Sequence, residues 1–341
     1  MSQSVGDLPQ EVLLRVRGLK KYFGEDGRKD AGVVRAVDDV SFDVRSGKTL
    51  ALVGESGCGK TTTSRCILRA QPPTAGNIWF RTAAGAVVDL ATLDARRLRP
   101  LRAELQMIFQ DPRSSLNPRL SVFDVVSEPL VVNGVTDRAL LRQQVGDLLE
   151  LVGLRREHMT RFPNAFSGGQ RQRIGIARAL ALKPRLIVAD EAVSALDVSV
   201  QAQILNLLLD LQDALQLSYL FVAHDLSVVK HISDEVGVMY VGQMMELGEC
   251  AALFERPLHP YTATLLAAVP KPDPRLRNRA RPPAGEAASP RNPPAGCSFH
   301  PRCPHAIERC RIERPAWSEA LPGRFVRCHR APELQLAGVG A

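Results

Sequence analysis

The sequence of 341 residues lacks several features that mark other classes of protein. No run of 18 apolar residues occurs, so no segment is expected to span a bilayer. The first twenty residues contain Asp7 and Glu11 and no apolar core, so we expect no secretory signal and a cytosolic start, where thiols stay reduced. No internal repeat at solenoid periods is present. Hydrophobic residues at 45% and charged residues at 23% are ordinary for a globular protein of one large or two modest domains.

The net charge of +8 is concentrated near the C-terminus. Residues 271–341 contain 13 Lys or Arg against 6 Asp or Glu, with 12 of the 24 prolines and four of the seven cysteines. This change in composition predicts a domain boundary near Pro270 and an extended linker from Lys271 to Pro294. A basic tail can bind nucleic acid or anionic lipid, but an ordinary solvated tail is an equally good interpretation.

Strands alternate with helices before this boundary. Short apolar or alternating segments, typical of strands, are separated by segments with apolar residues at helical spacings. Helix alternating with strand predicts an α/β fold with a parallel sheet covered on both faces. The predicted strands are 12–16, 37–44, 49–53, 105–109, 186–189 and 219–223, and the predicted helices are 62–68, 121–154, 169–182 and 200–215.

A glycine-rich loop separates the strand at 49–53 from the helix at 62–68. Its sequence fits the P-loop pattern and reads Gly54-Glu55-Ser56-Gly57-Cys58-Gly59-Lys60-Thr61. The glycines let backbone N–H groups turn inward, where they and the helix N-terminus can hold phosphate oxygens. Lys60 would reach the outer phosphates, and the Thr61 hydroxyl would bind Mg²⁺. An ordinary glycine-rich turn is the alternative, but the flanking strand and helix favour a MgATP site that also includes Thr62.

Two adjacent carboxylates follow the apolar strand at 186–189. Asp190 lies at the carboxyl end of this strand, where it can hold Mg²⁺ through water. Glu191 is then placed to orient and polarise an attacking water. A turn that merely ends a strand is the alternative, and the P-loop elsewhere in the chain disfavours it.

The segment Phe166-Ser167-Gly168-Gly169-Gln170 decides among P-loop proteins. It resembles the signature loop of the ABC ATPases, although the usual form begins with Leu rather than Phe. Ser167 and the two glycines present a hydroxyl and backbone N–H groups at a helix start, which makes a second anion site. The resemblance implies a sandwich dimer, in which each nucleotide lies between the P-loop of one subunit and the Ser167–Gln170 loop of the other.

Other landmarks of the family follow in order. Gln110 looks like the Q-loop glutamine, which senses the Mg²⁺ ion and the transmembrane partner. Ser194-Ala195-Leu196-Asp197 resembles the D-loop, and His224 looks like the switch histidine that contacts the γ-phosphate. Tyr22 or Phe23 would stack on adenine, and Tyr22 is the residue we assign. With Glu191 these residues imply an active ATPase, since every catalytic position is filled.

The resemblance also implies the architecture. It covers about residues 11–270 and implies an ABC ATPase core with antiparallel β and helical subdomains, the helical one at about 111–182. Residues 271–341 would form a small cysteine-rich C-terminal tail.

The residues that flank the motifs resemble those of one branch of the family, the oligopeptide and dipeptide importers. Gln110-Asp111-Pro112-Arg113-Ser114-Ser115-Leu116-Asn117-Pro118 and His259-Pro260-Tyr261-Thr262 are similar to those proteins. The resemblance implies a peripheral protein on the cytoplasmic face of the cell membrane, working under two transmembrane permease subunits. It also implies a homologous second ATPase, most simply in a heterodimer, and an extracytoplasmic peptide-binding protein, with no nucleic acid partner. The solute stays open among dipeptides, longer peptides and nickel chelates.

Four cysteines gather in the tail, at Cys297, Cys303, Cys310 and Cys328. Clustered cysteines in a cytosolic protein suggest a metal rather than disulfides. Zinc sites usually have closer cysteine pairs, and four thiolates also suit an iron–sulfur cluster, so zinc, a cluster and unligated thiols all stay open. Relatives among the peptide importers carry a [4Fe-4S] cluster in this tail, and the resemblance favours one here.

Two other functions compete with peptide import. A soluble ABC ATPase of DNA repair or translation would carry long coiled-coil insertions or two fused ATPase units, and the sequence has neither. A subunit that binds nucleotide for regulation only would have no use for the base at Glu191. The sequence therefore favours the ATP-hydrolysing subunit of an importer.

Overall fold

A computed structural model of the chain describes residues 8–24, 32–268, 288–331 and 333–339. The chain divides into two compact units, of which the first comprises residues 1–81, 87–92 and 223–341 and the second comprises 82–86 and 93–222. Of the predicted linker at 271–294, residues 271–287 lie outside the described part.

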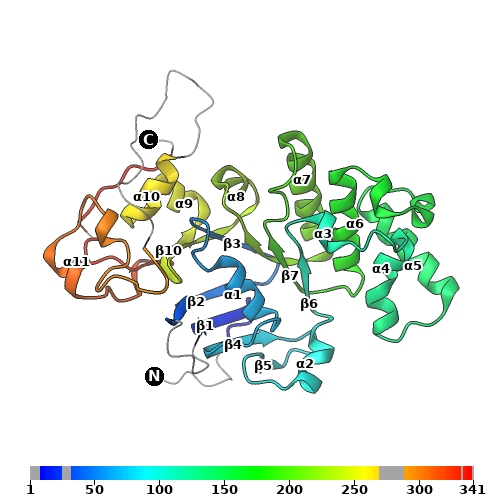
Figure 1. The fold of residues 1–341 in the computed structure, drawn as a ribbon, viewed down its shortest axis with the longest axis horizontal. Helices are drawn as coiled ribbons and strands as arrows, with labels where there is room; N and C mark the ends of the chain where they lie inside the picture. The colour runs from blue at the N-terminus through cyan, green and yellow to red at the C-terminus, as the bar shows by residue number, and fades with distance from the viewer. Residues whose placement is uncertain (1–7, 25–31, 269–287, 332, 340–341) are drawn as a thin grey trace. The chain divides into compact units, whose positions relative to one another are not determined.

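The first unit contains two sheets (Figure 1). The antiparallel one has the order β2-β1-β4-β5, and the strands of the other that belong to this unit run β11-β12-β10-β9-β3, with β3 parallel to β9. Strand bounds are β1 (Val12–Phe23), β2 (Val34–Arg45), β3 (Thr49–Val53), β4 (Ala75–Arg81), β5 (Val87–Asp89), β9 (Glu235–Tyr240), β10 (Gln243–Glu249), β11 (Ser318–Leu321) and β12 (Arg324–Val326).

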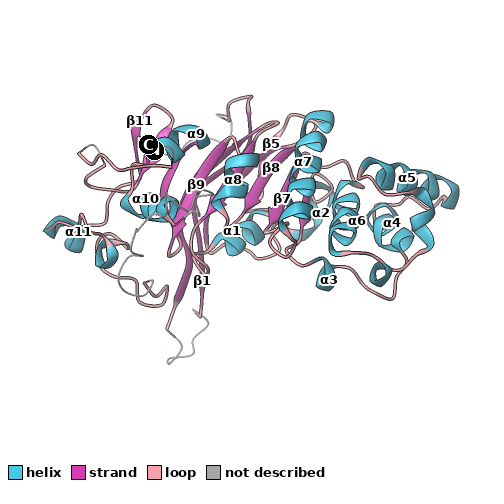
Figure 2. Cartoon of the chain, turned by 90° about the horizontal axis from the view of Figure 1, so that it is seen from above, coloured by secondary structure: helices cyan, strands magenta, loops and turns pink. Residues whose placement is uncertain are grey.

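Helices cover these sheets because each has a buried apolar face. Helix α1 (Lys60–Ile67) packs on β1 and β2, and α8 (Leu226–Ile232) packs on β3 (Figures 1 and 2). Helices α9 (Cys250–Glu255) and α10 (Pro260–Ala267) pack on β10, and α11 (Glu308–Ile312) lies farther along the chain.

The second unit is mostly helical around three parallel strands in the order β8-β7-β6. These are β6 (Leu105–Ile108), β7 (Leu186–Asp190) and β8 (Ser218–Val222). Its α-helices are α2 (Ala95–Leu101), α3 (Pro112–Ser115), α4 (Val122–Val132), α5 (Arg138–Leu151), α6 (Gly168–Leu180) and α7 (Val198–Leu215), with short 3-10 turns at Arg156–Thr160 and Pro163–Ala165.

The predicted α/β class is confirmed, with two differences. The predicted helix at 121–154 is two helices, because Gly134 adopts a φ of 96° and Asp137 caps the start of α5. The sheet is also not purely parallel, since β10, β11 and β12 pair antiparallel.

A cysteine-rich tail set apart from the core is not supported. Strand β12 pairs with β10 through Glu246 and Val326, so the C-terminal region extends a sheet of the first unit. The buried carboxylate of Glu246 accepts a bond from Arg324 at 2.7 Å, which links the same two strands a second time.

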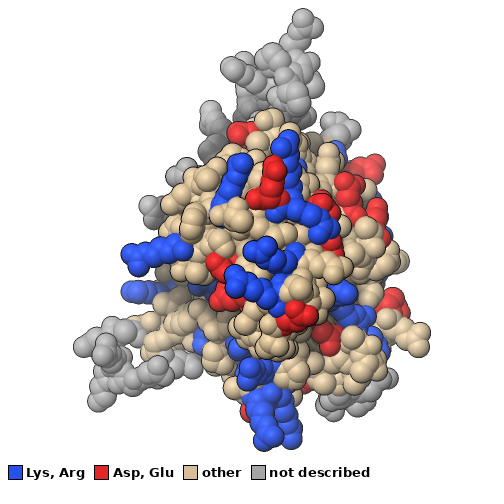
Figure 3. All heavy atoms as spheres, turned by 90° about the vertical axis from the view of Figure 1, so that its right-hand side faces the viewer, with Lys and Arg blue, Asp and Glu red and all other residues tan. Residues whose placement is uncertain are grey.

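The surface carries both signs of charge. Figure 3 shows basic side chains lying among acidic ones on one face of the molecule. In the second unit Arg155 pairs with Glu157 at 3.2 Å, and Arg156 pairs with Asp147 and Glu150. Water screens exposed pairs of this kind, so they add little to stability. Within the described ranges, no helix has both the length and the apolar character needed to cross a membrane.

Candidate nucleotide-binding site

The P-loop leaves the end of β3, whose five residues are all buried. Gly54 and Gly59 are required by geometry, because both have a positive φ, of 148° and 106°. A Cβ at Gly54 would lie 2.1 Å from the carbonyl oxygen of Met239, and one at Gly59 would lie 2.3 Å from that of Ala36. The backbone of the loop therefore approaches its neighbours more closely than any residue with a side chain permits.

Lys60 is buried at the first position of α1. Its Nζ donates to the carbonyl oxygens of Gly54 at 2.8 Å and Glu55 at 3.1 Å. The first N–H groups of a helix have no partner within the helix, so the positive end of α1 lies at this loop. A buried ammonium and a helix N-terminus together favour an anion at this place.

A cavity of about 480 Å³ lies against the P-loop. Its walls include Gly54, Glu55 and Ser56 on one side and His224 on another. Asp225 caps the following helix by accepting a bond from the N–H of Ser227 at 2.8 Å, which fixes the turn that carries His224. The structure thus places the predicted switch histidine beside the P-loop, in a cavity of the size that small molecules occupy.

Tyr22 is held by its hydroxyl group. The Tyr22 Oη donates to Asp38 Oδ1 at 2.6 Å, and burial and this bond raise the pKa of Tyr22 to about 12. The guanidinium of Arg35 lies 6.0 Å from the ring centroid. Phe23 is more exposed, and Lys21 lies 5.0 Å from its ring centroid. Of the two aromatic candidates, Tyr22 is therefore the one with a fixed orientation.

In the second unit, β7 ends at the buried carboxylate of Asp190, and Glu191 follows. Gln110 Nε2 donates to Glu191 Oε2 at 2.7 Å, so the structure brings these two predicted catalytic residues into contact. Glu191 has a φ of 49°, in the left-handed region that costs a residue with a side chain about 1–3 kcal/mol.

The turn at Glu191 is fixed by further bonds. The Glu191 N–H donates to Val222 at 2.9 Å, and both the N–H and the Oγ of Ser194 donate to the Glu191 carbonyl, at 3.1 and 3.0 Å. Ser194 begins the predicted D-loop, so this loop and the predicted base are parts of one turn.

The predicted signature loop starts α6. Ser167 caps the helix through two reciprocal hydrogen bonds with Gln170. The Ser167 N–H donates to Gln170 Oε1 at 3.1 Å, and the Gln170 N–H donates to Ser167 Oγ at 3.3 Å. Ser167 and Gly168 are exposed, whereas Gly169 is buried. A Cβ at Gly169 would lie 2.4 Å from Val200 in α7, so this glycine also permits helix packing, a role that the sequence did not indicate.

The four C-terminal cysteines line one small cavity of about 10 Å³, which has room for about one water-sized sphere. Burial raises the pKa of Cys297, Cys303 and Cys328 to about 11, which favours thiols over thiolates. No group of three His, Cys, Asp or Glu in the described part of the chain is arranged to hold a metal ion. The four thiols suit a metal as a set, but the predicted [4Fe-4S] cluster is not supported by their arrangement.

Contacts between the C-terminal region and the P-loop were not predicted. The N–H of Glu55 donates to Tyr261 Oη at 2.9 Å, and Arg302 Nη1 donates to both oxygens of the Glu55 carboxylate, at 3.0 and 2.9 Å. His259 and Pro260 carry a helix-start signal, the cap and the first-turn proline of α10, which places Tyr261. Nothing in the sequence indicates the contact from Arg302, since 247 residues separate it from Glu55.

Comparison with known proteins decides the family. Residues 37–194 match the family described as ABC transporter, and residues 245–310 match the C-terminal region of oligopeptide/dipeptide transporters. The chain is 50% identical over 94% of its length to a probable peptide ABC transporter ATP-binding protein, y4tS of Sinorhizobium fredii, and covers 91% of that protein. This chain belongs to the ABC transporter ATP-binding proteins. The ABC ATPase is also 49% identical to the oligopeptide transport ATP-binding protein AppF of Bacillus subtilis, over 94% of this chain and 98% of AppF.

A further relative is the di/tripeptide transport ATP-binding protein DppF of Pseudomonas aeruginosa, 47% identical over 95% of this chain and 99% of DppF. Among solved structures, the ABC ATPase resembles the dimeric ATP-binding cassette MJ0796 bound to ADP and Pi, with a TM-score of 0.61 and 25% identity. That likeness covers 70% of this chain and 99% of the cassette. The ABC ATPase fold predicted from the motifs is therefore confirmed.

Proposed function

We propose that this ABC ATPase is the ATP-hydrolysing subunit that energises peptide uptake through an importer in the cytoplasmic membrane. The observation that carries the proposal is the identity of about half of all residues with peptide, oligopeptide and di/tripeptide transport ATP-binding proteins along nearly the whole chain. The match at 245–310 to the C-terminal region of such transporters supports it independently of the ATPase motifs. A soluble ATPase of DNA repair or translation would account for neither the identity to transport proteins nor the match at 245–310.

In the first unit, Lys60 and the N–H groups from Ser56 to Thr62 would bind the phosphates of ATP, and Tyr22 would stack on adenine. The bonds of Lys60 within the loop and of Tyr22 to Asp38 support these roles. His224 would contact the γ-phosphate from the wall of the 480 Å³ cavity.

In the second unit, Glu191 would take a proton from the attacking water, with Gln110 orienting its carboxylate. In this unit the oxygens of Gln110 and Asp190 would hold Mg²⁺, and the metal would supply neutralisation of phosphate charge. In the first unit the Thr61 hydroxyl would take the same role. These hard oxygen ligands suit Mg²⁺. Ser167, Gly168, Gly169 and Gln170 would bind the nucleotide of a partner subunit across a dimer, and the dimeric state of the cassette MJ0796 supports a dimer here.

The partners would be a homologous second ATPase, most simply in a heterodimer, and two permease subunits that receive peptide from an extracytoplasmic binding protein. ATP closes the ATPase dimer and hydrolysis opens it, so the permeases alternate their access between the two sides of the membrane. The protein would then be peripheral, on the cytoplasmic face.

Purification of the chain with its permease neighbours tests this function. We expect two permeases and a second ATPase to co-purify, and peptide-loaded binding protein to raise the ATPase rate of the complex in proteoliposomes. The matched control is the same complex with Glu191→Gln, which should assemble but take up no peptide. Stimulation by a nickel chelate and by no peptide from two to five residues would reassign the solute, and failure to bind any permease would overturn the import proposal.

We also propose that Cys297, Cys303, Cys310 and Cys328 hold a [4Fe-4S] cluster that staples the C-terminal region. The proposal rests on donor chemistry, because cysteine thiolates are the usual ligands of such clusters. The cavity of about 10 Å³ that the four cysteines line would have to widen to take the cluster. Anaerobic purification is expected to give a brown protein with about four iron and four sulfide per chain. Cys303→Ser should lose this iron, whereas Cys250→Ser, a buried cysteine elsewhere in the unit, should keep it. Stoichiometric zinc without sulfide, or no metal at all, would contradict the cluster.

A further inference from the structure

The C-terminal region contacts the P-loop at one residue in two ways. Arg302 donates to the carboxylate of Glu55, and Tyr261 accepts from the Glu55 N–H, so both the side chain and the backbone of Glu55 are held. Only 10% of the Arg302 side chain and 31% of the Glu55 side chain are exposed, so water screens this ion pair less than a surface pair. Partial burial lowers the pKa of Arg302, but the bonds to Glu55 outweigh it and raise that pKa above its ordinary value.

The guanidinium of Arg302 is oriented by a buried aromatic cluster. Its central carbon lies 6.0 Å from the ring centroids of both Tyr240 and Phe299. Tyr240, Tyr261 and Phe299 pack together with centroids 4.6 to 5.4 Å apart, and each is at most 1% exposed. Such packing limits the rotamers of Arg302, so its contact with Glu55 costs little conformational entropy on formation.

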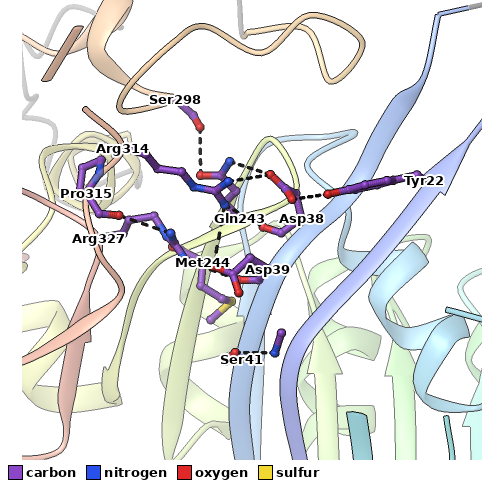
Figure 4. A network of polar contacts seen from close by, with 11 residues as sticks. Tyr22, Asp38, Asp39, Ser41, Gln243, Met244, Ser298, Arg314, Pro315 and Arg327 are labelled. Atoms are coloured by element: carbon purple, nitrogen blue, oxygen red, sulfur yellow. Dashed lines mark hydrogen bonds and ion pairs between the residues drawn. The ribbon is translucent and has the colours of Figure 1, made fainter. Parts of the chain in front are cut away.

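A second contact from the C-terminal region holds Tyr22, the residue that we place against adenine. Arg314 Nη1 donates to Asp38 Oδ2 at 3.0 Å, and the other oxygen of the same carboxylate accepts the Tyr22 hydroxyl (Figure 4). Gln243 joins the network by donating to Asp38 at 3.3 Å and accepting from Ser298 at 3.1 Å. Asp38 is only 4% exposed, and although burial raises its pKa, the bonds from Tyr22 and Arg314 hold that pKa below its ordinary value.

A third contact holds the strand that carries Asp38. Arg327 donates to Asp39 at 2.9 Å and to the carbonyl oxygen of Met244 at 3.2 Å. Asp39 has a φ of 70°, at a point where the register between β1 and β2 is irregular. A fixed arginine at this irregularity stabilises a local conformation that the strand pairing alone does not.

From these contacts we propose that Arg302 and Arg314 are positioning residues for ATP, Arg302 acting on the P-loop through Glu55 and Arg314 acting on Tyr22 through Asp38. The inference rests on the proposed ATP site at Lys60 and Tyr22. Neither arginine touches the reacting atoms, so each contributes to affinity by holding a binding group in place. The C-terminal region thereby sets how tightly ATP binds, from two sides of the nucleotide.

The experiment measures binding of MgATP and of magnesium tripolyphosphate, which has no base, to the full-length chain. Arg302→Ala is expected to raise the Kd for both ligands about 10-fold, because the P-loop binds the phosphates of each. Arg314→Ala is expected to raise the Kd for MgATP about fivefold and to leave that for tripolyphosphate within twofold, since stacking on Tyr22 needs a base. Arg309→Ala, which removes an exposed pair with Glu313 in the same region, should change neither.

Additional measurements separate positioning from general destabilisation. In steady-state assays Arg302→Ala should raise KM for ATP with kcat within twofold, and Arg302→Lys should recover most of the affinity. Glu55→Ala breaks the same contact from the other partner, so it should match Arg302→Ala, and the double variant should be no worse than either. If Arg302→Ala does not fold, the Glu55→Ala and Arg302→Lys results carry the test.

The outcomes are distinguishable. If the wild type binds MgATP and Lys60→Ala abolishes binding, the ATP site stands whatever the arginine variants do. Equal Kd values for the wild type, Arg302→Ala and Glu55→Ala would then overturn positioning by Arg302. An equal loss of both ligands in Arg314→Ala would overturn its action through Tyr22.

Discussion

Replacing Glu191 by glutamine is expected to leave ATP binding intact and to lower the hydrolysis rate about 10²–10⁴-fold, the contribution typical of a general base. The amide has nearly the same shape as the carboxylate, so the strained turn at Glu191 and its bonds to Val222 and Ser194 should persist. The amide oxygen can still accept from Gln110, but it cannot take a proton from water. The Kd for MgATP measured by titration should therefore stay within about twofold while the single-turnover rate collapses.

The matched control for this change is Glu157→Gln. Glu157 lies in the same unit, is 62% exposed at its side chain and pairs with Arg155. It should keep the wild-type hydrolysis rate. Turnover by Glu191→Gln within 10-fold of the wild type would show that another group takes the proton, and the assignment of Glu191 would be wrong.

The contact between Gln110 and Glu191 depends on the order of the strands in the sheet. Because Gln110 donates to Glu191, it orients the carboxylate. Gln110 lies two residues beyond the end of β6, and Glu191 directly follows the paired strand β7. The sequence placed both residues at strand ends, and parallel strands in register bring such ends together. This contact between residues 81 positions apart therefore follows from the topology of the sheet.

Other parts of the fold could not be predicted in this way. The strand at Thr49–Val53 was predicted to the residue, because four apolar residues after Thr49 lead directly into a glycine. The β9–β10 hairpin was not predicted. Its two-residue turn is Val241-Gly242, with φ of 44° and 75°, and only the glycine is typical of such a turn. Valine is a poor signal there, since turns with positive φ are usually marked by Asn, Asp or Gly.

The site residues likewise include some that the sequence identifies and some that only the fold identifies. Residues that belong to short motifs, such as Lys60 and Glu191, are identifiable because their spacing relates them to a neighbouring strand or helix. Arg302 and Arg314 are identifiable only from the fold, since their partners Glu55 and Asp38 lie about 250 or more residues earlier in the chain. No local pattern relates an arginine in a proline-rich segment to a carboxylate in a P-loop.

Replacing Lys60 by alanine is expected to raise the Kd for MgATP about 100-fold or more, which corresponds to about 2.8 kcal/mol. A charge-assisted hydrogen bond contributes about 1.5–3 kcal/mol, and the ammonium also supplies the bonds to Gly54 and Glu55 that shape the loop. Lys60→Arg should not restore binding, because the lysine is 5% exposed and the wider guanidinium does not fit its place. Titration with a fluorescent ATP analogue measures both variants.

Lys48→Ala is the matched control, since Lys48 belongs to the same unit and makes an ion pair with Asp234 at a side-chain exposure of 55%. It should bind MgATP like the wild type. A ligand that binds only the folded protein raises its melting temperature, so MgATP should stabilise the wild type and Lys48→Ala but not Lys60→Ala. Binding by Lys60→Ala within threefold of the wild type would mean that this loop does not hold the phosphates. If Lys60→Ala loses the stabilisation by MgATP but the free variant melts at the wild-type temperature, the defect lies in the missing ammonium. A collapsed loop would also lower the melting temperature of the free variant.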